Sequence, residues 1–173
     1  MSTSLYDISV GTYLQGLSSV EQILSKGADY CNANDIALDE IVATRLRDDM
    51  LPFHFQVVSV AHHSMNAVKG IMAGEAGPPS GFADTDYAGL QGYVATALAE
   101  INAVQREDLD AFAGKPVIFK LGSNELPFTA ENYVLSFSLP NFYFHATTTY
   151  DILRMNGVPL GKMDFLGRMR MAT

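Results

Sequence analysis

The chain contains little cysteine and no concentration of positive charge. Among its 173 residues Cys31 is the single cysteine, which excludes an internal disulfide and fits a reducing compartment. The net charge is −8, and the 11 lysines and arginines are scattered along the chain. Surfaces that bind nucleic acids or anionic membranes need a concentrated basic patch, so neither kind of partner is expected.

Charged residues and long apolar runs are also scarce. Only 17% of the residues are charged, below the usual quarter, whereas 48% are apolar. We therefore expect part of the surface to be covered, either by a second copy of the chain in a homodimer or by a ligand in an apolar cavity. No uninterrupted apolar run reaches about 18 residues, and the first residues lack the basic and then apolar order of a secretory signal. These absences predict a cytoplasmic protein without a transmembrane helix.

Several familiar catalytic signatures are missing as well. The sequence has no phosphate-binding glycine loop, no Gly-x-Ser-x-Gly elbow and no His-Glu-x-x-His pair. The chain therefore offers no short motif that assigns a reaction by itself.

Four long segments of helical periodicity are present. Apolar residues recur at spacings of three and four, and capping residues, prolines and glycines bound the segments. The expected helices cover residues 4–32, 52–73, 86–108 and 129–156. Four long helices with short connections predict an all-α four-helix bundle, as one domain over residues 1–173 with a draped C-terminal tail over 160–173.

The segments between and within these helices carry their own signals. Residues 36–50 are expected to form a connection with a helical turn, and the glycine- and proline-rich stretch 74–81 is a clear break. Gly11 and Gly16 lie inside the first helix, where glycine often permits close packing of another helix. Pro140 predicts a kink or a restart within the last helix.

Alternating apolar residues on both sides of Gly122 predict a small β-hairpin before the last helix, the one strand signal of the chain. The alternating residues are Val117, Phe119, Leu121, Leu126 and Phe128.

The last expected helix carries His145, followed eight and nine residues later by Leu153 and Arg154, and then by Gly157. This spacing resembles the last-helix pattern of DinB/YfiT-like bundles. Further pieces resemble one uncharacterised, domain-of-unknown-function branch of that superfamily. They are Arg45-Leu46, Asp49-Met50-Leu51-Pro52, Phe55-Gln56-Val57, Gly74 and the run from Gly157 to Gly167. The resemblance covers nearly the whole chain.

The resemblance implies a DinB-like four-helix bundle, often dimeric. In many such proteins it also implies a metal held by three histidines, one from the second helix and two from a His-x-x-x-His pair on the last. With His145 aligned to the second histidine of that pair, Asn141 stands where the first would be. We therefore predict no metal, and a divalent ion such as zinc or nickel is the alternative.

Three of the four histidines lie on the second expected helix. His54 and His62 are about 12 Å apart along a helix axis, so they are not expected to share an ion. His62 and His63 differ by about 100° around the helix, so at most one of them should point cleanly inward. The fourth histidine, His145, lies on the last helix.

A polar stripe marks the last helix. Asn141, His145 and Thr149 lie four residues apart on an otherwise apolar helix and so share one face. Buried polar groups need partners, and a second-helix side chain such as Gln56 or His62 could supply one. Three interpretations stay open: an internal hydrogen-bond network, a small-molecule pocket that uses the same groups, and a metal site.

The first functional hypothesis is a small-molecule-binding bundle, without metal or redox cofactor, whose pocket lies between the second and last helices. If the protein is an enzyme, His145 and Asn141 are the candidate catalytic residues, and Gln56, His62 and Thr149 contact the ligand. An unperturbed imidazole pKa of about 6.5 suits His145 to proton transfer at neutral pH, in an isomerisation or an elimination. The alternatives are a DinB-like metal-dependent transferase or hydrolase with an incomplete histidine triad, and a non-catalytic dimeric structural or interaction protein.

Overall fold

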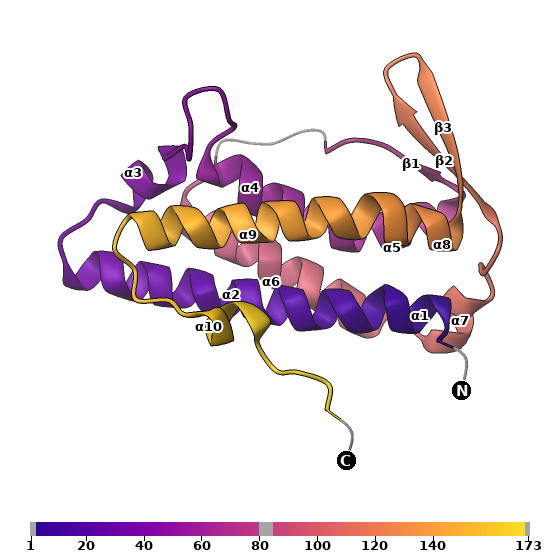
Figure 1. Cartoon of the computed structure of the whole chain (residues 1–173), viewed down its shortest axis with the longest axis horizontal. Coiled ribbons are helices and arrows are strands. Elements are labelled where there is room, and N and C mark those ends of the chain that lie inside the picture. Colours follow the sequence, from indigo (N-terminus) through magenta and orange to yellow (C-terminus); the bar gives the residue numbers. More distant parts are fainter. Residues whose placement is uncertain (1–2, 80–84, 172–173) are drawn as a thin grey trace.

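The computed structural model describes residues 3–79 and 85–171, and four long helical segments dominate it (Figure 1). Two of these segments are interrupted by a π-helical turn. The segments are α2 (Val10–Ala33); α4 (Phe53–Ala61), η1 (His62–Asn66) and α5 (Ala67–Ala73); α6 (Tyr87–Ala103); and α8 (Ala130–Tyr133), η2 (Val134–Ser138) and α9 (Leu139–Met155). The predicted helical bundle is confirmed.

The ends of the first two segments follow their capping residues. Ser4 caps α1 (Leu5–Ile8), and the side chains and backbones of Ser4 and Asp7 form a reciprocal capping box. The chain then breaks at Ser9 before α2 begins, so the single helix expected over 4–32 is in fact two pieces. The second segment starts directly after Pro52 and ends at Gly74, whose φ of 74° suits glycine.

The third segment is shorter than expected at its C-terminal end. Asp86 caps α6 by accepting a hydrogen bond from the Gly89 amide, but Val104 is extended, and a separate short helix, α7 (Arg106–Asp110), follows. The guanidinium of Arg106 lies 2.7 Å from the carboxylate of Asp7. The turn at Val104 thus brings α7 against α1, a long-range contact that the local helical pattern does not contain.

A three-stranded sheet lies at one end of the bundle. The predicted hairpin is confirmed as β2 (Pro116–Leu121) and β3 (Asn124–Thr129), antiparallel and joined at Gly122, which has a φ of 60°. A third strand, β1 (Glu75–Ala76), pairs in parallel with β2. It lies in the break predicted over 74–81, of which residues 80 and 81 are outside the described part. Two residues are too few to show a strand pattern, and their pairing is non-local.

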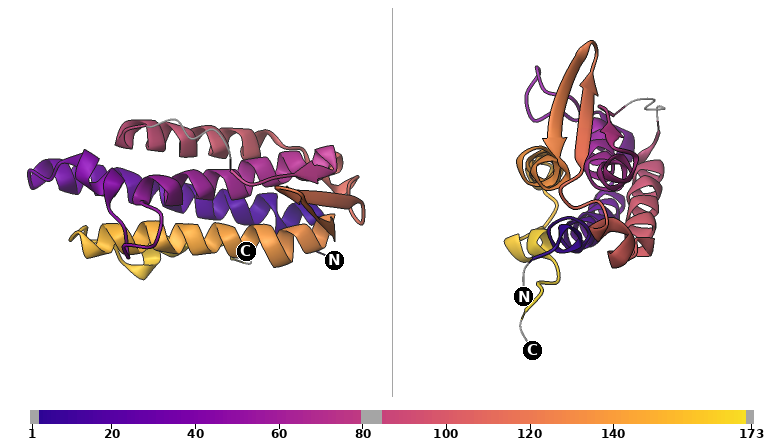
Figure 2. Two further views of the ribbon diagram at one scale, coloured as in Figure 1. Left: turned by 90° about the horizontal axis from the view of Figure 1, so that it is seen from above. Right: turned by 90° about the vertical axis from the view of Figure 1, so that its right-hand side faces the viewer.

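The segments form two parallel pairs. At one end the Phe53 ring stacks on Tyr87, with ring centroids 5.7 Å apart, and at the other end Lys69 and Glu100 form an ion pair of 2.5 Å. The segment α4–α5 therefore runs parallel to α6, while α2 and α9 run the opposite way (Figures 1 and 2). The closest helix packing joins α4 to α9 and α2 to α6.

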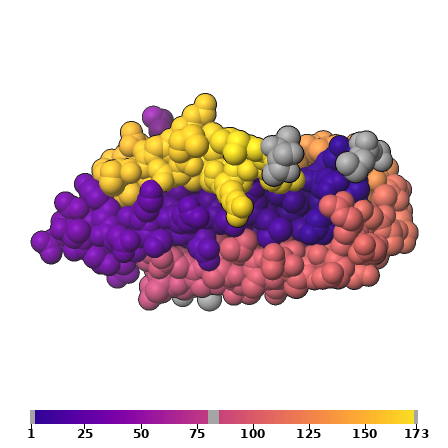
Figure 3. All heavy atoms as spheres, turned by 90° about the horizontal axis from the view of Figure 1, so that it is seen from below, coloured from indigo at the N-terminus to yellow at the C-terminus, as the bar shows by residue number. Residues whose placement is uncertain are grey.

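Two short helices complete the described chain. Residues 36–50 contain α3 (Leu38–Ala43), so the predicted connection with a helical turn is confirmed. The segment after Gly157 folds back along α2 and forms α10 (Lys162–Leu166), seen as the yellow band in Figure 3. Among the described helices, none is both long and apolar enough to cross a membrane.

Candidate functional site

The π-helical turn η1 places two adjacent histidines in the interior of the bundle. His62 and His63 are 8% and 5% exposed. A π-turn is wider than an α-turn, so consecutive side chains are separated by a smaller angle around the axis, and such turns recur at functional sites. Both histidines are therefore buried, His63 against the last helical segment and His62 against the connecting residue Gly77. Sequence periodicity assumes a regular helix and carries no signal for this turn.

The imidazole ring of His63 lies beside that of His62 in η1 and beside that of His145 in α9. The ring centroids of His62 and His63 are 5.1 Å apart and nearly perpendicular, and those of His63 and His145 are 5.8 Å apart and nearly parallel. We call His62, His63, His145 and Gln56 the histidine cluster. His63 is the member that the sequence did not single out as a site residue.

The proton of His145 is fixed by Gln56. The Nδ1 atom of His145 lies 2.8 Å from Oε1 of Gln56, while the amide nitrogen of Gln56 donates to the carbonyl of Leu51. A carbonyl oxygen can only accept, so Nδ1 carries the hydrogen and Nε2 of the neutral ring carries a lone pair. His145 is thus held in the tautomer that can accept a proton or a hydrogen bond at Nε2.

His62 is already satisfied at both nitrogens. Its Nε2 donates to the carbonyl of Gly77 at 2.9 Å, and its Nδ1 accepts from the Asn66 amide at 2.9 Å. The His62 side chain also lines an open hollow of about 340 Å³ together with Asn66, Lys69 and Gly77. His62 therefore connects the cluster to the surface without a direct hydrogen bond to His145.

Two members of the predicted polar stripe bond to their own helix. The amide nitrogen of Asn141 donates to the carbonyl of Phe137, and the hydroxyl of Thr149 donates to the carbonyl of His145. The predicted internal network thus contains His145 and Gln56, whereas Asn141 is not part of that pair. A shared helix face does not decide the partner, because a backbone carbonyl one turn earlier competes for the same hydrogen bond.

His63 has an unpaired nitrogen within the described residues. Its Nδ1 is buried and lacks a hydrogen-bond partner there, as does the hydroxyl of Ser59 one turn earlier. Most buried polar side-chain atoms in proteins are hydrogen-bonded, and leaving one unpaired costs about 1–3 kcal/mol. An unpaired ring nitrogen is therefore a group that a bound molecule can satisfy.

Burial keeps the cluster uncharged at neutral pH. Desolvation lowers the pKa of His145 to about 4, so the ordinary value assumed from the sequence does not hold in the folded chain. Desolvation and the proximity of His62 and His145 lower the pKa of His63 to about 3, and burial also lowers the pKa of His62. All three rings are thus neutral bases at pH 7.

Aromatic rings enclose His145. The rings of Phe55 and Phe144 meet it edge-on at centroid distances of 5.7 and 5.2 Å, and Phe137 meets His63 in the same way at 5.9 Å. Phe144 itself is 57% exposed, whereas His145 is only 9% exposed. The apolar surroundings explain the low pKa of His145.

The residues present do not fit a three-histidine metal centre. Asn141 occupies the place of one histidine and bonds to Phe137, and both nitrogens of His62 are engaged. Across residues 3–79 and 85–171, no three side chains of histidine, cysteine, aspartate or glutamate are grouped to hold a metal.

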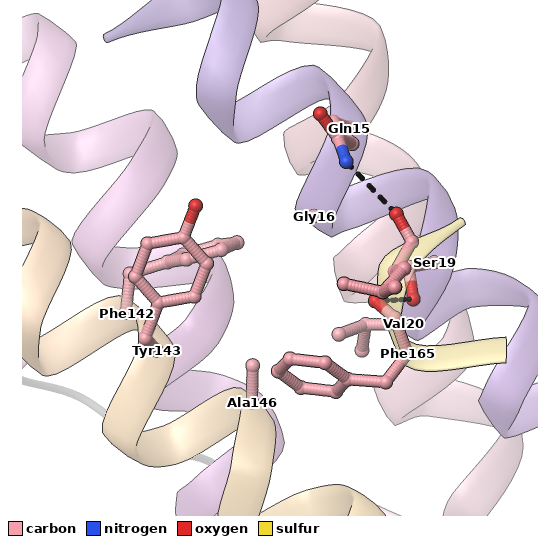
Figure 4. Close-up of a pocket in the computed structure, with 9 residues that line it drawn as sticks. Gln15, Gly16, Ser19, Val20, Phe142, Tyr143, Ala146 and Phe165 are labelled. Carbon is pink, nitrogen blue, oxygen red and sulfur yellow. Dashed lines mark hydrogen bonds between the residues drawn. The ribbon is translucent and has the colours of Figure 1, made fainter. Parts of the chain in front are cut away.

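A second, smaller hollow of about 80 Å³ lies between α2 and α9 (Figure 4). Gly16 and Ser19 of α2, Phe142 and Ala146 of α9, and Phe165 of α10 line it. Its lining holds no titratable group except the Tyr143 hydroxyl. We place the candidate site at the histidine cluster because it gathers three imidazoles, one of them with an unpaired ring nitrogen.

Comparison with known proteins agrees with this architecture. Residues 5–166 match the family described as a domain of unknown function, DUF1993. The chain belongs to the DUF1993 family. No functionally curated protein matches it.

A solved structure shows a fold similar to that of this chain. The chain is similar to a crystal structure of a DinB family member protein from Shewanella denitrificans, with a TM-score of 0.82 and 26% identity over 98% of this chain and 95% of that one. This DUF1993 chain is thus a DinB-like helical bundle, as its last-helix pattern predicts.

Proposed function

We propose that this DUF1993 protein binds a small molecule at the histidine cluster, and that His145 exchanges a proton with it. The observation that carries the proposal is the pairing of His145 Nδ1 with Gln56 at 2.8 Å, which leaves a lone pair on Nε2. A second imidazole, that of His63, lies beside it with a buried and unpaired Nδ1.

The low pKa of His145 restricts the class of ligand. A ring with a pKa of about 4 is a weak base, and a buried imidazolium is unstable unless an anion lies next to it. Removing a proton from a carbon or oxygen acid leaves that anion in contact with the new imidazolium. The reaction class that fits is proton transfer to and from such an acid, as in an isomerisation or an elimination.

A thermal-shift screen tests this proposal. The probes are a panel of small 2-oxo acids, hydroxy acids and phenols, applied to the wild-type protein, His145→Ala and His54→Ala. A ligand at about one hundred times its Kd adds about 2.7 kcal/mol to the unfolding free energy, which raises Tm by roughly 5–10 °C in a chain of this size. We expect at least one compound to shift wild type and His54→Ala but not His145→Ala.

Other results contradict the proposal in distinct ways. Equal shifts in wild type and His145→Ala place the binding site elsewhere. No shift with any compound favours a structural or interaction role. Near-stoichiometric zinc or nickel in protein purified without a histidine tag favours a metal-dependent transferase or hydrolase.

A further inference from the structure

The two π-helical turns are joined by a buried chain of hydrogen bonds. The hydroxyl of Ser138, the last residue of η2, donates to the carbonyl of His63 in η1 at 2.6 Å. The hydroxyls of Tyr13 and Ser138 are 2.7 Å apart. Because Ser138 has a single hydrogen and uses it toward His63, Tyr13 must be the donor to Ser138.

This chain connects three helical segments at one point. Tyr13 comes from α2, Ser138 from the last segment, and His63 from the second, and the first two side chains are fully buried. Phe137, the neighbour of Ser138, contacts the His63 ring. Adjacent residues of η2 therefore hold the backbone of His63 through Ser138 and its imidazole through Phe137.

We propose that Tyr13 and Ser138 are positioning residues of the histidine cluster. The π-turn η1 contains both His62 and His63, and the contacts of Ser138 and Phe137 fix the backbone and the ring of His63 within it. A hydrogen bond to the His63 carbonyl from outside the helix holds the backbone in the π-helical arrangement. Removing it frees that carbonyl for a different partner, and the His63 ring then leaves its place beside His145.

This inference deepens the proposed function. It rests on the proposed function in one respect, namely that the histidine cluster is the ligand site. The chain of hydrogen bonds exists without a ligand, so it can be tested without one. A failed ligand screen and a failed test of positioning are therefore distinguishable results.

The protein supplies a matched control for Tyr13. Tyr87 is equally buried, and its hydroxyl also donates one internal hydrogen bond, to the carbonyl of Leu24 at 2.9 Å. Both Tyr13→Phe and Tyr87→Phe keep the ring and remove one buried hydrogen bond. A purely structural role predicts the same consequences for both.

The experiment compares Tyr13→Phe, Ser138→Ala and Tyr87→Phe by two readouts specific to histidine. The first is the ¹H–¹³C spectrum of the imidazoles, with His63 and His145 assigned from His63→Gln and His145→Gln. The second is the rate at which diethyl pyrocarbonate modifies each histidine, measured by mass spectrometry. We expect Tyr13→Phe and Ser138→Ala to shift the His63 signals and to raise its modification rate several-fold, most strongly in Ser138→Ala.

Tyr87→Phe should lower Tm without changing either histidine readout. The positioning role is overturned if Tyr13→Phe and Ser138→Ala lower Tm but leave the His63 signals and modification rate at wild-type values. It is equally overturned if Tyr87→Phe changes them as much. If either Tyr13→Phe or Ser138→Ala fails to fold, the histidine readouts of the other variant decide whether the positioning role holds.

Discussion

Buried histidines make the stability of this fold depend on pH. The pKa values of His145, about 4, and of His63, about 3, lie below the ordinary 6.5 in the folded chain. As the pH falls below about 6.5, the unfolded chain takes up protons that the folded chain does not. We therefore expect the unfolding free energy to be constant above about pH 6.5 and to fall between about pH 6.5 and 4. The loss is at most about 1.4 kcal/mol per pH unit for each histidine.

Urea unfolding at about pH 7 and about pH 5 measures this loss. His63→Gln removes one of the three histidines whose pKa is lowered by burial, so its stability should fall less steeply with pH than that of wild type. The carboxyl of Asp7 does not disturb the comparison, because its ordinary pKa of 3.8 and its pKa of about 2 beside Arg106 both lie below this pH range. An unchanged slope in His63→Gln would show that its imidazole is protonated in the folded chain as readily as in the unfolded one.

The sequence pattern predicted the hydrogen-bonding partners of some site residues but not of others. Gln56 and His145 were both candidates, and they are hydrogen-bonded partners in the structure. Asn141 shares the face of His145, yet its amide nitrogen bonds to its own helix. The two side chains differ because a backbone carbonyl one turn earlier competes for the amide hydrogen of Asn141. The outcome of this competition depends on the side-chain rotamer and not on the spacing in the sequence.

At the level of elements, the contact between α2 and α9 depends on a glycine. A Cβ atom at Gly16 would lie 2.5 Å from Cε1 and 2.7 Å from Cζ of Phe142, a fully buried ring. The close packing expected at Gly16 is therefore confirmed. The Phe142 ring has little room to move, because it also packs edge-on against Tyr13 at 5.5 Å.

Gly16→Ala should destabilise the protein by about 1–3 kcal/mol, even though alanine is the better helix former by about 1 kcal/mol. Gly92→Ala on α6 is the matched control, because among the described residues no atom outside its own turn of helix lies within 4 Å of its added Cβ. That variant should gain about 0.5–1 kcal/mol. Chemical denaturation of both variants measures the two effects, and a gain in both would mean that α2 and α9 can separate at no cost.

Pro140 is accompanied by a π-helical turn in the last helical segment. The sequence predicts a kink or a restart there, and the structure has the π-turn η2 directly before it, with Pro140 in the first turn of α9. Proline lacks an amide hydrogen and collides with the carbonyl four residues earlier, so a regular α-helix cannot pass through it unchanged. The irregular turn accommodates the ring and, at the same time, directs Ser138 toward His63.

At the scale of the whole molecule, the C-terminal segment is a bound part of the fold. The hydroxyl of Ser19 donates to the carbonyls of Asp164 and Phe165, and Gln15 donates to the carbonyl of Leu166. Lys26 and Asp164 add an ion pair of 2.5 Å. The tail expected to be draped and partly ordered over 160–173 lies along α2 in its described part, to residue 171, and contains the short helix α10 (Figure 3).

Ser19→Ala removes the hydroxyl whose single hydrogen is shared between the carbonyls of Asp164 and Phe165, at a cost of about 1 kcal/mol. Local release of α10 should then be about five-fold more frequent, and trypsin should cleave after Lys162 correspondingly faster under native conditions. Ser18→Ala, one position earlier on the same helix, is the control and should leave the rate unchanged. Equal rates in all three proteins would mean that α10 is held by other contacts.

Homodimerisation of the whole molecule stays a prediction. It was expected from the low content of charged residues, and large apolar side chains such as Leu135, Tyr143 and Phe144 are exposed on the last helical segment. Exposed apolar surface of this kind is compatible with a partner but does not identify one.

The sequence alone determined the helical segments and most of their ends. Apolar periodicity placed the four segments, and Ser4, Pro52, Gly74 and Gly157 marked ends that the structure confirms, because capping and left-handed conformations are properties of a few consecutive residues. The hairpin at Gly122 and the likeness to DinB-like bundles followed from equally local patterns.

Only the tertiary structure decided the π-turns, the strand β1 and the geometry of the site. The turn at His62–Asn66 is bonded through Ser138, some 75 positions away along the chain, and β1 exists through its pairing with β2. Whether a histidine is buried, which nitrogen carries its proton and how far its pKa falls all depend on neighbours from other helices. Those neighbours meet only when the chain has folded, so no local pattern contains them.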